Sequence, residues 1–551
     1  MTPAARRAAT LERFASRVFD LLIVGGGASG AATARDAALR GLDVALCDAG
    51  DFAAETSSQS SKLIHGGLRY LQYGNLHLVF EGLTERRRLM HAAPHLCRPI
   101  EFLFPGYQGE SPGLSTLGVG IALYNALALW RPPAQGRRLS AHDLYGLAPH
   151  LRAAGLAGAM AYVDCQTDDA RLVLENVLDA EASGATVANH LRAESLLRDR
   201  RGRVTGAVLA DAETGARFET RARVVLSATG PFTDAFVEDK TGSHRLRPTL
   251  GVHLVFDATR VPNHGRAMVL RSPRDNRLFF VLPAGPRTVV GTTDTDWPSP
   301  RPPRIDDDIR AHGDDVAYLL EAANHAFPSL GLGPDDVLST YAALRPLLAT
   351  SAHTPSETSR EHEIARAADG LLLIAGGKLT TLRRMGEEAV DRAVEALQAA
   401  GLERAIQRCA TTDRLLPGGG PPPAALEEAG LDADVHARLA GAYGGRADQV
   451  LQLARSAPEL AARIDPELPY FWAEVVHAVR FEHARAVGDV LRRRVPLFRD
   501  ARDQGLGAAE RVAAILSDEL GWPPAPRERA LADYRSAVER SRRWRDEFTI
   551  T

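Results

Sequence analysis

A glycine-rich segment near the N-terminus constrains this chain more than any other feature. Residues 25–30 read GGGASG. The apolar run FDLLIV (19–24) precedes them, and the alanine-rich residues 31–40 and a second apolar run, LDVALC (42–47), follow. This order of strand, glycine turn, helix and strand is that of a dinucleotide-binding β-α-β unit. In such a unit Gly25 permits a tight turn, Gly27 lets the backbone approach a pyrophosphate, and Gly30 lets the helix pack closely on the sheet.

The residues around this turn favour a bound dinucleotide over an empty glycine-rich turn. Ser29 falls in the first turn of the expected helix, whose free N–H groups and positive dipole end attract phosphates. Asp48 closes the second strand, at a position where a carboxylate can accept hydrogen bonds from ribose hydroxyls.

Two later segments decide between NAD and FAD. Ala228-Thr229-Gly230 ends the apolar strand 223–226, and Gly376-Gly377-Lys378 ends the strand 371–374 just before a helix. A chain that returns three times to one nucleotide site surrounds a long ligand, so we predict FAD.

The remaining pattern predicts an α/β fold, α+β overall. It combines a Rossmann-type FAD-binding domain with an interleaved β-rich substrate (cap) domain, indicated by the strand-rich residues 245–300, and a helical C-terminal domain. Residues 76–91 read as a helix with Arg86, Arg87 and Arg88 on its outer side. The expected division is a lead-in 1–18 without an assigned role; an FAD-binding domain 19–95, 155–235 and 340–400; a cap 96–154 and 236–339; a linker 401–423 around LPGGGPPP; and the helical domain 424–551.

Composition narrows the class of protein. The 551 residues suffice for two or three structural units, and 66 basic against 69 acidic residues give no global charge that would attract nucleic acid. The four cysteines are widely separated and lack metal-ligand spacing, so we expect reduced, buried thiols in a cytosolic protein, and no metal. They are Cys47, Cys97, Cys165 and Cys409.

An uncharged stretch, residues 113–130, complicates this soluble character. Its length is at the lower limit of a membrane span. The pattern favours a buried core helix, and a helix in the bilayer interface, with Trp130 and Arg131 at the headgroups, is the third alternative.

The run SSQSSKLIHGGLRY (57–70) is the most specific in the chain. With the glycine turn it closely resembles the FAD-dependent glycerol-3-phosphate dehydrogenases. The similarity covers nearly all of residues 19–495. It continues through DDARL (168–172), GTTD (291–294), LRPL (344–347), GGKLTT (376–381), RFEHA (480–484) and DVLRRR (489–494).

The resemblance implies a flavin that takes a hydride from C2 of glycerol 3-phosphate and leaves dihydroxyacetone phosphate. Electrons would then pass to ubiquinone or menaquinone. The family's members lie on the membrane surface, in bacteria on the cytoplasmic face, and a homodimer is plausible.

A phosphate group needs several converging cations. By the family's pattern we assign Arg345 and Arg360 to the phosphate, and Arg69 to the phosphate or a substrate hydroxyl. A single arginine is more often a solvated surface charge, and the motif context favours the pocket for Arg69 and Arg345 and, less strongly, for Arg360. Tyr70 belongs to the same expected substrate pocket. Thr292, Thr293 and Asp294 could bind the substrate, orient an arginine or form a plain turn.

Oxidation of the alcohol requires a base for the O2 proton. His65 is a candidate, and it could instead position its loop by bonding flavin or backbone; His253 is a second candidate. Lys378 and Arg345 could stabilise the developing alkoxide or the reduced flavin.

The expected FAD contacts extend beyond the glycine turn, and one position departs from the family. Many relatives carry a lysine where this chain has Leu250. The further expected FAD contacts are Ser57, Ser61, Leu63, Ala193, Gly230, Gly377, Lys378, Leu379 and Thr380.

Three other functions stay open. An oxidase would pass the same electrons to oxygen, although the insertion common in such oxidases is not seen. An amine or amino-acid oxidase could share the fold, although HGGLRY argues against it. A flavin-binding membrane scaffold would show no turnover.

Overall fold

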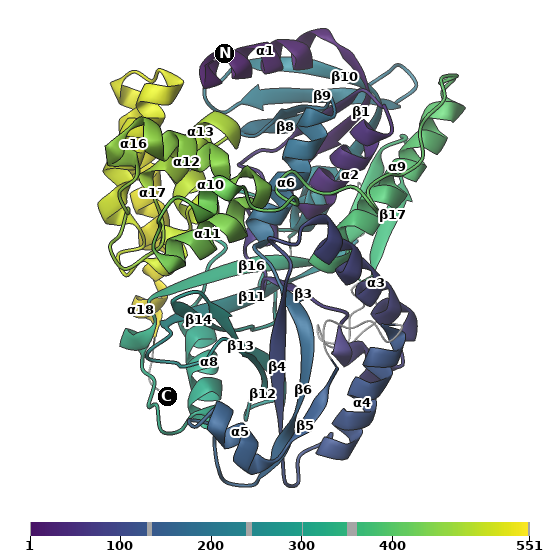
Figure 1. Ribbon diagram of the computed structural model, residues 1–551. Coiled ribbons are helices and arrows are strands. Elements are labelled where there is room, and N and C mark those ends of the chain that lie inside the picture. The colour runs from purple at the N-terminus through teal and green to yellow at the C-terminus, as the bar shows by residue number, and fades with distance from the viewer. Residues whose placement is uncertain (1, 129–134, 238–244, 300, 350–360, 549–551) are drawn as a thin grey trace.

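The computed structural model describes residues 2–128, 135–237, 245–299, 301–349 and 361–548. Two sheets and a group of C-terminal helices make up the described part (Figure 1). The first sheet lies beside α1 and α2, the second lies below it in the view, and the helices flank both. The predicted α/β fold with a helical C-terminal part is confirmed.

The first sheet has the strand order β17-β18-β10-β1-β2-β7. The parallel neighbours of β1 are β10 and β2, and β18 and β7 extend the parallel part outward. Both faces of β1 are buried beyond Val18, which explains why its sequence is apolar at every position but Asp20 instead of alternating. The bounds are β1 Val18–Val24, β2 Val44–Cys47, β7 Thr186–Ala188, β8 Leu191–Arg198, β9 Val204–Asp211, β10 Arg217–Ser227, β17 His362–Arg366 and β18 Leu372–Gly376.

Helices cover both faces of the first sheet. On one face α2 (Ala28–Leu39), α6 (Asp169–Ala182) and α9 (Leu382–Ala399) enclose a core of small aliphatic side chains. On the other, α1 (Pro3–Ser16) buries Phe14 completely, 5.9 Å from the ring of Phe19. Residues 1–18, for which the sequence suggested no role, thus include a covering helix.

The second sheet has the order β15-β11-β14-β13-β12-β4-β6-β3, with β16 paired to β11. The helices α5 (Ala141–Leu147) and α8 (Gly313–Ala326) pack on one face, and α4 (Leu114–Leu127) packs on the other. Its strands are β3 Leu63–Ile64, β4 Arg98–Tyr107, β5 Arg137–Leu139, β6 Leu156–Gln166, β11 Leu246–Asp257, β12 Ala267–Arg271, β13 Leu278–Ala284, β14 Arg287–Gly291, β15 Thr295–Asp296 and β16 Ser339–Leu348.

Three strands of this second sheet lie in segments that we had placed in the FAD-binding domain. β3, β6 and β16 fall within 19–95, 155–235 and 340–400, yet their hydrogen bonds are made in the second sheet. Buried strands of the two sheets read alike in sequence, so the pattern did not reveal the partner strand. The domain division as a whole stays a prediction.

The C-terminal helices form two adjoining cores. The chain then leaves them, and α18 (Trp544–Glu547) buries Trp544 in the core of the second sheet. The other principal helices are α11 Ala433–Tyr443, α12 Ala447–Ser456, α13 Trp472–Phe481, α16 Leu506–Leu520 and α17 Pro524–Arg542.

The expected linker is a packed connection. Leu416 is buried, and a Cβ on Gly418 would lie 2.5 Å from Glu175 Oε1 and from His95 Nε2. The glycines that suggested flexibility are therefore needed, at least at Gly418, for close approach.

The uncharged stretch forms α4, which buries Leu114, Leu117, Ile121 and Tyr124 on one face. Its other face exposes Val119 and Leu123. Among the described residues, no helix is both long and apolar enough to cross a bilayer. Trp130 and Arg131 lie outside the described residues. Cys47, Cys97 and Cys165 are buried free thiols as expected, and Cys409 is half-buried.

Candidate active site

The glycine turn between β1 and α2 has the predicted geometry. Gly25 has φ +106°, and a Cβ on Gly30 would lie 1.8 Å from the carbonyl oxygen of Gly25, so α2 can pack here only without a side chain. A Cβ on Gly27 would lie 2.9 Å from Ser57 Oγ, and this hydroxyl accepts a hydrogen bond from the Ala28 N–H at 2.9 Å. Gly27 thus leaves space for Ser57 beside the helix N-terminus.

Asp48 closes the turn from the end of β2. Its Oδ2 accepts from the Gly26 N–H at 2.6 Å and its Oδ1 from the Gly50 N–H at 2.8 Å. Burial raises the pKa of this carboxyl to about 6, although the two hydrogen bonds favour the charged form. Asp48 is therefore a carboxylate at neutral pH that titrates nearer to neutrality than an exposed aspartate.

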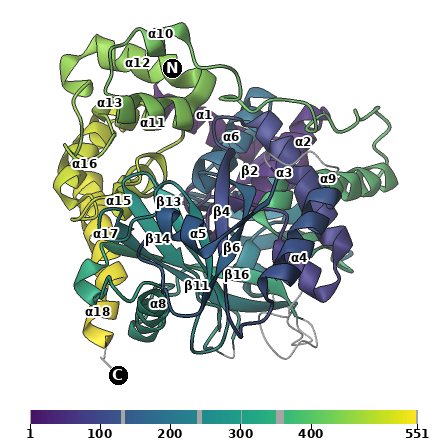
Figure 2. The same ribbon diagram turned by 60° about the horizontal axis from the view of Figure 1, so that its bottom comes forward.

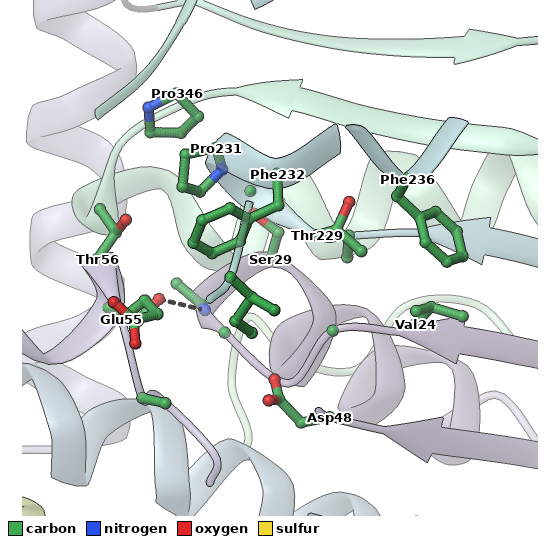
Figure 3. A pocket seen from close by; sticks show the side chains of 18 of the residues that line it. Val24, Ser29, Asp48, Glu55, Thr56, Thr229, Pro231, Phe232, Phe236 and Pro346 are labelled. Carbon is green, nitrogen blue, oxygen red and sulfur yellow. Dashed lines mark hydrogen bonds between the residues drawn. The ribbon is translucent and has the colours of Figure 1, made fainter. Parts of the chain in front are cut away.

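A cavity of about 620 Å³ opens where β1, β2, β10 and β18 end (Figure 3). Figure 3 shows Asp48 and Ser29 beside the glycine turn, with Phe232 and Pro346 among the other lining residues. The expected cofactor residues that line it are Gly25, Gly27, Ser29, Asp48, Ser57, Ala193, Gly230, Gly377, Lys378 and Leu379.

The remaining expected cofactor residues lie around this lining. Gly30 packs against Gly25, Leu63 is buried in β3, and Ser61 and Thr380 bond to the two candidate histidines.

The cavity fits FAD. Its volume is within the range of roughly 300–1,000 Å³ common for cofactor sites. The first hydrogen bond of α2 runs from the Ala31 N–H to the Gly27 carbonyl at 2.9 Å, so the N–H groups of Ser29 and Gly30 have no acceptor within the helix and could hold a pyrophosphate.

His65 follows β3 and is held through its backbone. Its N–H donates to Thr380 Oγ1 at 3.1 Å, and its carbonyl accepts from the same hydroxyl at 3.2 Å. The next N–H, of Gly66, donates to the Tyr124 hydroxyl at 2.7 Å, which in turn donates to Asp164. The loop that carries His65 is therefore held on one side by the turn that follows β18 and on the other by α4.

Lys378 connects the cavity with the HGGLRY segment. It lines the cavity, and its Nζ lies 3.9 Å from the centre of the Tyr70 ring, within the range of a cation–π interaction. Tyr70 belongs to η2 (Leu68–Tyr73), a 3₁₀ turn that begins after Gly67. The structure thus places Lys378, an expected cofactor contact, against Tyr70, an expected substrate contact.

Arg345, on β16, is oriented by the GTTD segment. Its guanidinium donates to Thr292 Oγ1 at 2.8 Å, to the Thr293 carbonyl at 3.0 Å and to Asp294 Oδ1 at 3.0 Å. The next residue, Pro346, lines the cavity. Of the alternatives for this segment, orientation of an arginine agrees best with these contacts.

His253, on β11, stacks on Tyr341 at 4.6 Å, and its Nε2 lies 2.9 Å from Ser61 Oγ. Burial, helped by the charges of Arg345 and Lys62, lowers the pKa of this imidazole well below its ordinary value. His253 is therefore neutral near pH 7. Its Nδ1 has no hydrogen-bond partner within the described ranges.

Two expected substrate contacts cannot be located: Arg360 and the side chain of Arg69 lie outside the described part of the structure. Leu250, where many relatives have lysine, packs in the core of the second sheet, so no cation occupies that strand position. The roles assigned to all these site residues stay predictions.

Some lining residues were missed. Arg192, Arg304 and Asp306 line the cavity, and Thr56 Oγ1 donates to the Leu344 carbonyl at 2.7 Å, which ties the Ser/Thr-rich loop to β16. Residues 304–306 belong to a charged loop whose sequence resembles ordinary surface, so no pattern could have identified them.

A glycine turn after β1, an acidic residue ending β2 and two further strand ends around one cavity define an FAD-dependent oxidoreductase. Comparison with known proteins agrees. Residues 20–392 match the family model of the FAD dependent oxidoreductases, and residues 409–527 match that of the C-terminal domain of alpha-glycerophosphate oxidase.

Full-length relatives give the narrower family. The aerobic glycerol-3-phosphate dehydrogenase of Staphylococcus epidermidis is 33% identical over 548 residues, 96% of each chain. The glycerol-3-phosphate dehydrogenase of a Synechocystis species is 33% identical over 552 residues, 95% of this chain and 97% of its own. The crystal structure of the Bacillus halodurans glycerol-3-phosphate dehydrogenase, complexed with FAD, matches with a TM-score of 0.79 and 30% identity over 98% of both chains. The chain belongs to the FAD-dependent glycerol-3-phosphate dehydrogenases, and the predicted cofactor, FAD, is confirmed.

More distant structures share the fold alone. The L-alpha-glycerophosphate oxidase of Mycoplasma pneumoniae matches with a TM-score of 0.55 at 17% identity, and a Geobacillus kaustophilus glycine oxidase with 0.52 at 20%.

Proposed function

We propose that this protein oxidises sn-glycerol 3-phosphate to dihydroxyacetone phosphate, with FAD as hydride acceptor and a membrane quinone as the final acceptor. The observation that carries this proposal is the placement of Arg345 and Lys378. Arg345 is fixed next to Pro346, a residue of the cavity lining, and Lys378 lines the cavity itself. Two cations beside the flavin cavity would bind a small anionic alcohol.

Each residue has a distinct task in this proposal. Arg345 binds the phosphate in an orientation set by Thr292, Thr293 and Asp294. Lys378 stabilises negative charge that develops on O2 as its proton leaves. The bound flavin supplies the two-electron acceptor for the hydride from C2.

Two histidines can take the O2 proton. His65 has a fixed backbone position, and His253 is held neutral, as a base must be, by burial and by the neighbouring cations Arg345 and Lys62. We favour His65, because the pKa of His253 is lowered so far by burial and the neighbouring cations that its imidazole is a weak base.

The test is anaerobic titration of the holoenzyme with glycerol 3-phosphate, following the visible absorbance of oxidised flavin. We expect bleaching by glycerol 3-phosphate and none by glycerol, which lacks the phosphate. Bleaching by amino acids instead would indicate an amine or amino-acid oxidase, and no bleaching at all would indicate a scaffold without turnover. Reoxidation by a quinone analogue, measured against oxygen consumption, separates dehydrogenase from oxidase.

A membrane quinone requires access to the membrane. Exposed apolar side chains gather on two helices that pack side by side (Figures 1 and 2), α3 (Leu76–Ala92) and α4. Leu76 and Phe80 are exposed on α3, and Val119 (70%) and Leu123 (40%) on α4. We propose that this α3–α4 surface rests on the cytoplasmic face of the membrane; a homodimer stays a prediction.

Vesicle binding tests this surface. Val119→Asp with Leu123→Asp should reduce cosedimentation with phospholipid vesicles and leave reduction of a water-soluble quinone analogue unchanged. Leu415→Asp is the matched control, because Leu415 is comparably exposed (42%) but lies outside α3 and α4. Undiminished cosedimentation of the double variant would refute this orientation.

A further inference from the structure

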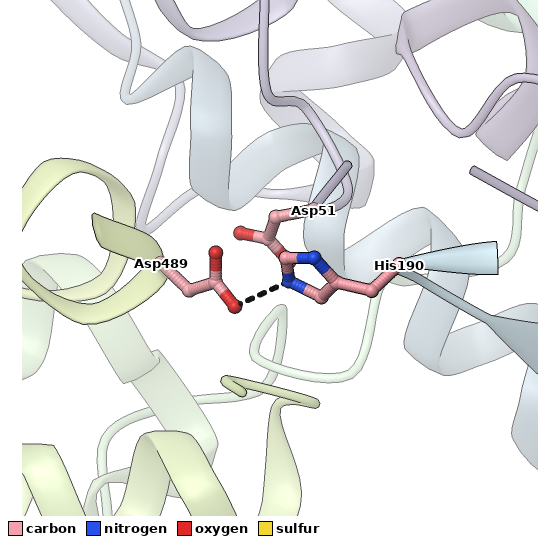
Figure 4. A group of neighbouring side chains, drawn as sticks. All are labelled: Asp51, His190 and Asp489. Carbon is pink, nitrogen blue, oxygen red and sulfur yellow. Dashed lines mark hydrogen bonds and ion pairs between the residues drawn. The ribbon is translucent and has the colours of Figure 1, made fainter. Parts of the chain in front are cut away.

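The RFEHA and DVLRRR motifs lie in the C-terminal helices, far along the chain from the glycine turn. Nothing in the proposed reaction uses them. Two side chains of DVLRRR, Arg493 and Arg494, nevertheless bind Asp51, a residue of the loop that follows β2 and Asp48. Figure 4 shows Asp489 of the same motif beside Asp51.

Asp51 is almost completely buried, with 1% of its surface exposed. Arg493 Nε donates to its Oδ2 at 2.6 Å, and Arg494 donates to both of its oxygens, at 3.0 Å to Oδ1. The Asn189 amide donates to Oδ1 at 2.9 Å. The carboxylate of Asp51, in a loop of the first sheet, is thus enclosed by two guanidinium groups of the C-terminal part.

The same network could be mistaken for a metal site. Asp51, His190 and Asp489 come together in Figure 4, with ligand atoms within 4.8 Å of one another. His190 Nε2 is bonded to Asp489 Oδ2 at 2.8 Å, and Arg493 also donates to Asp489 Oδ1 at 2.9 Å. Since arginines and a histidine already neutralise both carboxylates, the cluster is explained as an ion-pair network.

The loop that carries Asp51 forms one wall of the FAD site. Three residues earlier, Asp48 binds the Gly26 N–H. Two residues later, the Ala53 N–H donates to the Gly26 carbonyl at 3.1 Å. Between them the Gly50 carbonyl accepts from the His190 N–H at 2.6 Å. A displacement of Asp51 would therefore move both contacts that hold Gly26 in the glycine turn.

We propose that the DVLRRR motif positions the FAD-binding loop: Arg493 and Arg494 fix Asp51 and thereby hold Asp48 and the glycine turn in the geometry that binds the dinucleotide. Arg494 also donates to the Glu482 carbonyl at 2.6 Å, so RFEHA supports the same contact. The C-terminal helices are then part of the cofactor site without touching it. This inference concerns FAD and does not rest on the identity of the substrate.

A matched pair of substitutions tests it. Arg494→Lys keeps the charge but loses the two-point contact with Asp51, which a lysine cannot reproduce. Arg287→Lys makes the same change at another buried arginine that contacts the C-terminal helices: its guanidinium donates to the Asp500 carbonyl at 2.7 Å and to Asp257 Oδ2 at 2.8 Å, away from Asp51 and its partners. Both variants should lower the melting temperature of the holoenzyme.

FAD release should separate them. The rate at which diluted holoenzyme releases fluorescent FAD should rise by roughly fivefold or more in Arg494→Lys and by less than about twofold in Arg287→Lys. Kinetic constants for glycerol 3-phosphate, measured with saturating FAD, should match wild type in the control variant Arg287→Lys.

A milder variant guards against misfolding. Asn189→Ala removes one hydrogen bond to Asp51 and should speed FAD release in the same direction, by a smaller factor. Equal release from the Arg494→Lys and Arg287→Lys enzymes would overturn the proposal, as would wild-type release from both Arg494→Lys and Asn189→Ala. If Arg494→Lys yields no folded protein, Asn189→Ala alone decides.

Discussion

Thr380 holds the backbone of His65 from two directions. Its Oγ1 accepts the N–H of His65 at 3.1 Å and donates to the carbonyl of His65 at 3.2 Å, although the two residues are 315 positions apart. Thr380 belongs to η6 (Leu379–Thr381), the turn that begins after Lys378. The turn that brings Lys378 to the cavity therefore also fixes the backbone position from which the His65 side chain extends.

Replacement of this hydroxyl should slow the chemistry. Thr380→Val keeps the shape but loses both bonds to His65, so we expect flavin reduction by glycerol 3-phosphate to slow by about tenfold, as reacting groups drift from alignment. Thr380→Ser retains the hydroxyl and should stay near wild type. Stopped-flow absorbance under anaerobic conditions measures both; equal rates for the valine and serine variants would exclude a positioning role.

Gly27→Val should give protein without flavin. The new side chain would first meet Ser57 Oγ, 2.9 Å from its Cβ, and would displace the hydroxyl that accepts from the Ala28 N–H at the start of α2. The ratio of flavin to protein absorbance in the purified variant measures the loss. Gly113→Ala is the control, because nothing lies within 4 Å of its added Cβ and its φ of −70° suits alanine. A fully loaded Gly27→Val protein would contradict the assigned cofactor geometry.

Arg345→Ala should reduce kcat/KM for glycerol 3-phosphate by roughly 10- to 100-fold, the value of a charge-assisted contact to phosphate. Arg277→Ala is a close control, since Arg277 shares Asp294 with Arg345, at 3.1 Å, and has no role in our proposal. Steady-state kinetics with saturating FAD compare the two variants. A similar loss in both would indicate that Arg345 acts through its ion pair with Asp294 and does not bind the phosphate.

Local features of this site were predictable from the sequence. The turn at Gly25, the packing at Gly30 and the carboxylate at Asp48 depend on residues next to one another in the chain or on adjacent strands, so spacing alone located them. Gly230 and Gly377 follow β10 and β18, which are parallel neighbours in the first sheet, and the ends of such strands meet at one edge.

Features set by distant partners were not predictable. Arg86 was expected on the outer side of its helix, but it is buried and pairs with Asp164. The sequence does not distinguish an arginine that is paired in the interior from one in solvent, because the partner of Arg86 lies 78 positions away. Gly418 looked like part of a flexible linker for the same reason: its neighbours Glu175 and His95 come from other elements.

The raised pKa of Asp48 predicts a pH dependence of FAD binding. Without FAD, the folded protein keeps a proton on Asp48 between its ordinary pKa of 3.8 and the folded value of about 6. The free energy of unfolding therefore falls as pH rises through that window. Ribose hydroxyls that donate to the carboxylate would lower its pKa, so FAD affinity should increase as pH rises towards and past about 6 and then level off. Fluorescence titration of the apoprotein across this range should show the rise in wild type and not in Asp48→Asn; an unchanged slope in that variant would assign the titration to another group.

An exposed ion pair beside the cavity should slow the exit of FAD. Arg192, on β8 of the first sheet, pairs through both terminal nitrogens with Asp306, in a loop of the second, at 2.7 and 3.0 Å, and both residues line the cavity. Because exposed pairs contribute little, we expect Arg192→Ala to speed FAD release only about two- to fivefold at low salt. The difference should vanish near about 1 M salt, where screening acts over roughly 3 Å. The exchange Arg192→Asp with Asp306→Arg should restore slow release.

Arg198→Ala is the control on the same strand, since it breaks an exposed pair with Asp369 and Arg198 is absent from the cavity lining. Release from Arg192→Ala at the wild-type rate in low salt would show that this pair does not retain the cofactor.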